Sequence, residues 1–68
     1  MTREELKRLM AARDETMKAF MGHKLKADAT PDEALDFQIE ERRLSRVATE
    51  ARMVFDRALA DFTEQVAA

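Results

Sequence analysis

Apolar residues recur every three or four positions along both halves of the chain, which is the spacing that places them on one face of an α-helix. In the first half this stripe comprises Leu6, Leu9, Met10, Met17, Phe20 and Met21. In the second half it comprises Phe37, Leu44, Val47, Ala48, Ala51, Val54, Phe55, Ala58, Leu59, Phe62 and Val66. One Gly, one Pro and few β-branched residues leave little material for strands or long loops. The pattern therefore predicts an all-α fold of two amphipathic helices.

The start of the second helix is marked by the segment Thr30-Pro31-Asp32-Glu33. Thr30 is a favourable N-cap, Pro31 fits the first helical position, and Glu33 is placed to reach back to the cap amide as a capping box. Thr2 and Glu5 repeat this spacing, so the first helix is expected to begin near the first residue.

The end of the first helix is less sharply marked. Gly22 could terminate it, but Lys24, Leu25 and Lys26 are good helix formers, and cations suit a helix C-terminus. We therefore predict an antiparallel helical hairpin with helices over about 2–26 and 31–66, a turn at about 27–30, and a single domain over 1–68.

Charge and side-chain size both favour the hairpin. Residues 1–27 carry a net charge of +3 and residues 28–68 a net charge of −5, so the two helices attract each other. Folding at the predicted turn pairs residues whose numbers add up to about 57. This register places Leu6 beside Ala51, so that a large side chain faces a small one.

Five charged residues lie on or beside the apolar stripes. In the predicted register Lys24 meets Glu33, and Arg13 lies within one turn of Glu40 and Glu41. We interpret them as interhelical ion pairs that fix the register of an otherwise forgiving interface. The alternative is a carboxylate metal site or a polar catalytic pocket, for which further ligands are lacking.

The predicted second helix is longer than the first, and its apolar stripe continues beyond the point where the first helix ends. A contiguous apolar patch of this kind marks an interface. We predict a homodimer that closes into an antiparallel, coiled-coil-like four-helix bundle. The predicted interface comprises Val54, Phe55, Ala58, Leu59, Phe62 and Val66. Alternatively, a helix of a target protein could lie against this overhang.

A weaker stripe lies on the far side of the second helix. It comprises Leu35, Ile39, Arg42, Arg43, Arg46 and Met53. Apolar residues interleaved with Arg are typical of protein-binding patches. Arg42, Arg43 and Arg46 could instead contact nucleic-acid phosphates, but the pI of about 5.3 and the absence of Tyr and Trp argue against this alternative.

The sequence lacks the residues that most catalytic sites require. There is no Cys, no Gly-rich phosphate loop and one Ser, and His23 is the only His. We expect no enzymatic activity, no cofactor, no metal and no small-molecule substrate. No apolar run is long enough for a signal peptide or a membrane span, which predicts a cytoplasmic location.

These observations predict a non-enzymatic, homodimeric protein-binding module that modulates, as a regulator or inhibitor, a second protein. The alternatives are a nucleic-acid-binding regulator and a structural adaptor or assembly scaffold.

Overall fold

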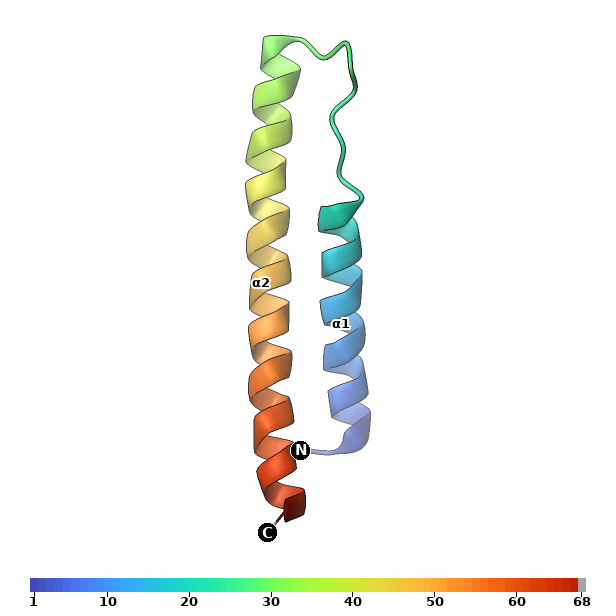
Figure 1. Cartoon of the computed structure of the whole chain (residues 1–68), viewed down its shortest axis with the longest axis vertical. Helices are drawn as coiled ribbons and strands as arrows, with labels where there is room; N and C mark the ends of the chain where they lie inside the picture. Colours follow the sequence, from blue (N-terminus) through green and yellow to red (C-terminus); the bar gives the residue numbers. More distant parts are fainter. Residues whose placement is uncertain (68) are drawn as a thin grey trace.

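The computed structural model describes residues 1–67. They include two helices, α1 (Arg3–Met21) and α2 (Pro31–Ala67), joined by a non-helical linker. The helices lie side by side and antiparallel (Figure 1). Together they make a rod of 56 × 14 × 12 Å, and no strand occurs within the described residues. The prediction of an all-α hairpin is confirmed.

Both helices begin at the predicted caps. The Thr2 hydroxyl accepts a hydrogen bond from the Glu5 N–H at 3.2 Å. At α2, the Thr30 hydroxyl accepts from the Glu33 N–H at 3.2 Å, and the Thr30 N–H donates to the Glu33 carboxylate at 3.4 Å. This reciprocal pair is the capping box that the sequence predicts.

The predicted end of the first helix is wrong, because α1 ends at Met21 rather than near Lys26. The Gly22 N–H closes the last turn on the Lys18 carbonyl at 2.9 Å. The chain then leaves the helix, and the His23 ring stacks flat on Phe37, with ring centroids 4.2 Å apart and planes 5° from parallel. Gly opposes helix continuation through its backbone entropy, and the stack gives the departing chain a fixed alternative path.

The non-helical linker over 22–30 also changes the register between the helices. An extended residue advances roughly 3.3 Å and a helical one about 1.5 Å, so residues 23–26 carry α1 about 7 Å farther along α2 than a helix would. That distance equals about five helical residues. Leu6 accordingly packs with Phe55 and Ala58 and not beside Ala51.

The seam between the helices follows the alternating spacing of three and four residues that is typical of coiled coils. In α1, buried and half-buried side chains on this spacing are Leu6, Leu9, Arg13, Thr16 and Phe20. In α2 they are Ala34, Phe37, Glu41, Leu44, Ala48, Ala51, Phe55, Ala58 and Phe62.

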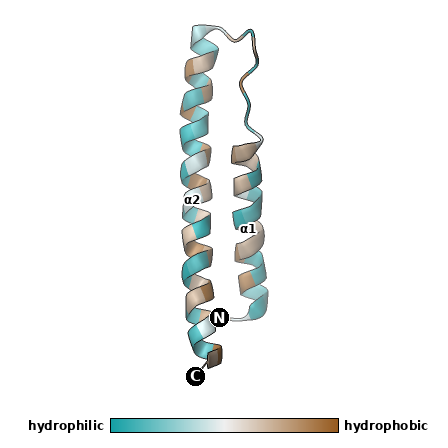
Figure 2. Cartoon of the chain, viewed as in Figure 1, coloured by the Kyte–Doolittle hydropathy of each residue, from teal (hydrophilic) through white to brown (hydrophobic). Residues whose placement is uncertain are grey.

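The resulting core is thin. Among the described residues only Leu6, Ala48, Phe55 and Ala58 are buried, and large apolar side chains remain exposed on both helices. Hydrophobic and hydrophilic residues are interspersed along each helix, as Figure 2 shows. A two-helix layer can bury only one stripe of each helix, and so most of the surface stays in contact with solvent.

Candidate interaction surfaces

The predicted ion pairs between the helices do not form. Within residues 1–67 the ion pairs lie inside one helix or between the linker and α2. Glu33 pairs with Lys26 at 2.5 Å, and not with Lys24. The Lys26 ammonium, together with the Thr30 N–H, holds the pKa of Glu33 below its ordinary value of 4.5. Lys26 reaches Glu33 because the linker, rather than a helix, runs beside the start of α2.

Arg13 lies opposite Phe55 and not opposite Glu40 or Glu41. Its guanidinium carbon is 4.5 Å from the Phe55 ring centroid, and its Nη2 is 3.0 Å from the Asp14 carboxylate. The shifted register carries Arg13 along α2 past both glutamates. A half-buried Arg on the seam is therefore accommodated by an aromatic face and a local carboxylate.

The residues of the predicted dimer interface differ in how far α1 covers them. Phe55 and Ala58 are buried against α1, so the expectation that the first helix leaves them uncovered is wrong. Phe62 is half-buried against the same cluster, whereas Leu59 and Val66 are exposed. The register shift extends α1 over most of the predicted overhang.

A groove runs between the helices at the end of the hairpin that lies opposite the linker. It encloses about 350 Å³ and is lined by Arg3, Leu6, Lys7, Met10, Phe55, Leu59 and Phe62. Leu59 and Phe62 also line the adjoining hollow, which leads on to Val66 and Ala67. We call the apolar part, Leu6, Met10, Phe55, Leu59, Phe62 and Val66, the open-end groove.

The contribution of α1 to this groove was not predicted from the sequence. Arg3, Lys7 and Met10 follow one another at intervals of four and three residues, which places them on one side of α1. That spacing was visible in the sequence, but only the correct register shows that this side of α1 adjoins Leu59 and Phe62. The predicted interface residue Val54 lies on the opposite flank, in a hollow that it shares with Met1 and Leu9.

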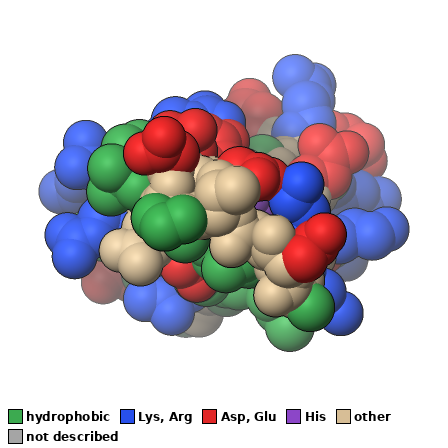
Figure 3. Space-filling view, turned by 90° about the horizontal axis from the view of Figure 1, so that it is seen from above, with side chains coloured by type: hydrophobic (Ala, Val, Ile, Leu, Met, Phe, Trp, Pro, Cys, Tyr) green, Lys and Arg blue, Asp and Glu red, His purple; other side chains and the backbone are tan. Residues whose placement is uncertain are grey.

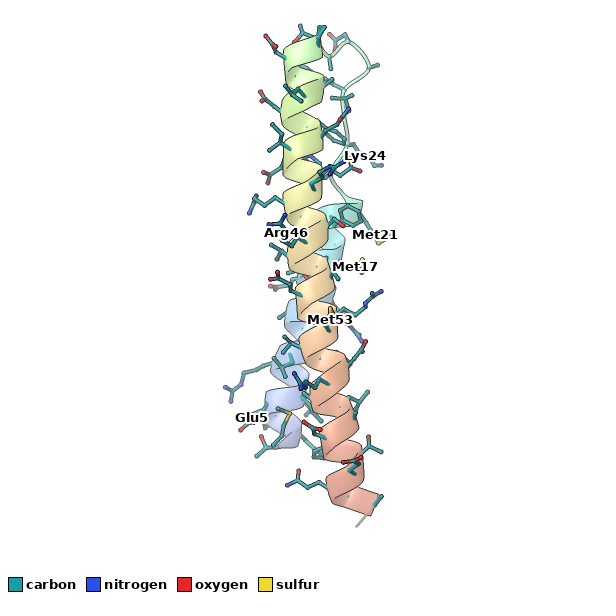
Figure 4. The ribbon with its side chains drawn as sticks, turned by 90° about the vertical axis from the view of Figure 1, so that its left-hand side faces the viewer. Glu5, Met17, Met21, Lys24, Arg46 and Met53 are labelled. Atoms are coloured by element: carbon teal, nitrogen blue, oxygen red, sulfur yellow. The ribbon has the colours of Figure 1, made fainter. Side chains whose placement is uncertain are left out.

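The second predicted stripe lies along the face of α2 that points away from α1. Its apolar members are strongly exposed, Leu35 at 57%, Ile39 at 60% and Met53 at 62%. Met53 and Arg46 lie on the side of α2 that faces the viewer in Figure 4, with α1 behind. We call Leu35, Ile39, Arg42, Arg46 and Met53 the outer stripe.

Arg43 does not belong to the outer stripe. Its guanidinium donates to the Glu40 carboxylate through Nε at 3.0 Å and through Nη2. This pair raises the pKa of Arg43 and lowers the pKa of Glu40. Because Glu40 offsets its charge locally, Arg43 adds little to a cluster of basic side chains.

A further hollow of about 680 Å³ adjoins the outer stripe at Met53. Its lining residues are Glu50, Met53, Val54, Asp56 and Arg57. Because α2 alone supplies every lining residue, this hollow is a furrow along one helix and not an enclosed cavity. It adds concave surface beside the stripe, but it does not shield a bound molecule from water.

Within the described part of the chain the candidate sites are open, largely apolar surfaces. Within residues 1–67, no three acidic or His side chains gather where they could hold a metal ion. Neither α1 nor α2 contains a segment sufficiently long and apolar to cross a membrane. Seen from the linker end, apolar side chains reach the surface between acidic and basic ones (Figure 3).

Comparison with known proteins adds no family to this description. No protein-family model, no curated protein and no solved structure matches the chain.

Proposed function

We propose that the chain is a homodimeric, non-enzymatic protein-binding module that modulates a second protein through the outer stripe of α2. The observation that carries this proposal is the exposure of Leu35, Ile39 and Met53 on one helical face, with Arg42 and Arg46 among them. Fully covering a side chain of this size is worth roughly 1.5–3 kcal/mol. An unpartnered row of such residues therefore favours association.

The spacing of the outer stripe suits an elongated partner. Leu35, Ile39, Arg42 and Arg46 follow one another at intervals of four, three and four residues. A row with this spacing fits an apolar ridge or groove that runs along the helix, as in helix-in-groove recognition. Arg42 and Arg46 favour a partner with carboxylates at its rim, because Arg forms bidentate hydrogen bonds to carboxylates.

A protein partner is better supported than a nucleic acid. The sequence suggested a cluster of three Arg residues, but Arg43 is paired with Glu40. The remaining two, Arg42 and Arg46, share their face with three large apolar side chains, which have no role in contacting phosphates. Phosphate recognition generally relies on a broad basic patch.

The test is a capture experiment in extracts of the source cells with the full chain as bait. The double variant Arg42→Glu, Arg46→Glu is compared with the unmodified chain and with the control Arg8→Glu, Lys18→Glu, which makes the same charge change on the exposed side of α1. We expect a protein to be captured by the unmodified chain and by the control. The outer-stripe variant should lose it, with at least a tenfold drop in recovery.

Equal capture by both double variants would contradict the assignment of the outer stripe. Repeating the capture at several salt concentrations, with and without nuclease, separates the alternative. Capture that depends on nucleic acid and falls steeply with salt would replace the proposed protein partner with a nucleic acid.

A further inference from the structure

The hairpin exposes more surface than an average folded monomer of the same mass. Its accessible area is 5655 Å², whereas a folded monomer of this mass exposes about 4,400 Å². The surplus is on the order of 1,300 Å², and a standard protein–protein interface buries about 800 Å² on each partner. The rod therefore carries enough excess surface for one complete interface.

The open-end groove is the part of this surface that is best shaped to be covered. Residues from both helices form its walls, and its apolar members Met10, Leu59 and Val66 remain exposed. Helical spacing places Met17 and Met21 on the same side of α1 as Met10, and both project to one side of the hairpin in Figure 4. Met side chains adapt well to an apposed apolar surface.

The opposite flank of the hairpin is less suitable. Val47 and Val54 are exposed there, but helical spacing places the Glu40–Arg43 ion pair on the same flank. Covering that flank would remove both charges from water, and the desolvation penalty can exceed the attraction between them.

We infer that a second copy of this chain occupies the open-end groove, so that two hairpins meet at their open ends about a two-fold axis. This inference rests on the homodimer in the proposed function and specifies its interface. A two-fold interface pairs one patch with itself. Because the groove lies near one end of the rod, self-pairing brings the two open ends together and not the open end of one copy to the linker of the other.

Charges at the rim complement this arrangement. Arg3 and Lys7 line the α1 side of the groove. On the α2 side, Asp56 lies one turn before Leu59 and two turns before Thr63. When the two-fold axis runs along the rod, α1 of one copy faces α2 of the other. The basic rim of each copy then faces Asp56 of the other copy.

The test measures the mass of the purified full chain by light scattering at micromolar concentration. Leu59→Glu places a charge in the groove at a side chain that is 42% exposed, and Val54→Glu makes the same change on the opposite flank at one that is 52% exposed. We expect the unmodified chain and Val54→Glu to be dimers. Leu59→Glu should weaken dimerisation at least 100-fold and yield monomer.

A Leu59→Glu variant that remains dimeric would overturn the inference, as would a Val54→Glu variant that dissociates in its place. A second measurement covers the case in which Leu59→Glu unfolds. The sequence lacks Cys, so a single introduced Cys reports its own neighbours. Oxidised Thr63→Cys, at the groove, should form linked dimers, and Val47→Cys, on the opposite flank, should not.

If Val47→Cys links and Thr63→Cys does not, or if a mixture of Thr63→Cys with the linker variant Leu25→Cys yields mainly mixed dimers, the open ends do not meet and the inference is wrong. All of these measurements use the purified chain alone. Loss of target capture on changing Arg42 and Arg46 tests the proposed function separately, so failure of one proposal is distinguishable from failure of the other.

Discussion

At the scale of single residues, the hairpin depends on a small cluster around Phe55. Leu6 and Ala58 complete the buried set, Leu9 packs against it, and the Arg13 guanidinium covers the Phe55 ring. The ring therefore has apolar contacts on one side and a cation over its face, where the electrostatic attraction is strongest. Few other contacts join the helices with this degree of burial.

Leu6 is the one buried side chain that α1 supplies. Leu6→Ala should lower the free energy of unfolding by about 2 kcal/mol, near the small end of the range for buried Leu because the neighbouring groove is open to solvent. Urea denaturation followed by circular dichroism measures the loss. The control Leu35→Ala removes an exposed side chain from the outer stripe and should change stability by less than about 0.5 kcal/mol. Equal losses in the two variants would contradict the assignment of the core.

At the scale of elements, the linker determines where α1 lies on α2. The linker is held against α2 at two points, where His23 stacks on Phe37 and where Lys26 pairs with Glu33. The Nε2 atom of His23 also lies 3.3 Å from the Phe37 carbonyl oxygen. A tethered, extended segment of this kind acts as a spacer, and its length sets the register of the whole hairpin.

The linker ends at Thr30, the N-cap of α2. Thr30→Ala removes the hydroxyl that accepts from the Glu33 N–H, and it should cost about 1 kcal/mol of stability. Thr30→Ser keeps the hydroxyl and should stay within about 0.5 kcal/mol of the unmodified chain. Urea unfolding of the three proteins checks the order. If Thr30→Ala unfolds at the same urea concentration as Thr30→Ser, the capping box does not stabilise α2.

Much of this element-level picture could be predicted from the sequence, since it rests on local signals. Thr2, Thr30 and Pro31 mark helix starts through interactions within one turn, and apolar spacing identifies the inward faces. The end of α1 was harder to predict because Gly22 competes with three good helix formers. The stack of His23 on Phe37 is a tertiary contact that no local pattern records.

The early end of α1 explains why the contacts at the candidate site differ from those predicted. Ending α1 early moved Arg13 from Glu40 to Phe55, and it brought Phe55 and Ala58 under α1. The outer stripe was less affected, because the face of a helix opposite its partner does not depend on where the partner lies along it. Only Arg43 changed its role there, through the local pair with Glu40.

At the scale of the whole molecule, the surface of the hairpin is consistent with the proposed homodimer. Its core is a single seam, its accessible area exceeds that of a folded monomer of this mass, and its open-end groove adjoins the buried cluster around Phe55. A second copy over the groove would extend that cluster into a continuous core between the chains. The outer stripe, on the face of α2 opposite the seam, would remain accessible to another protein.

The central claim, that a second copy completes this fold, is tested most directly by the thermal unfolding midpoint of the unmodified chain as its concentration is varied over a hundredfold range. Folding that is linked to association makes the midpoint depend on concentration. We predict that the midpoint rises steadily with concentration. A cooperative transition with the same midpoint at every concentration would contradict the claim, because it would show that the isolated hairpin is stable by itself.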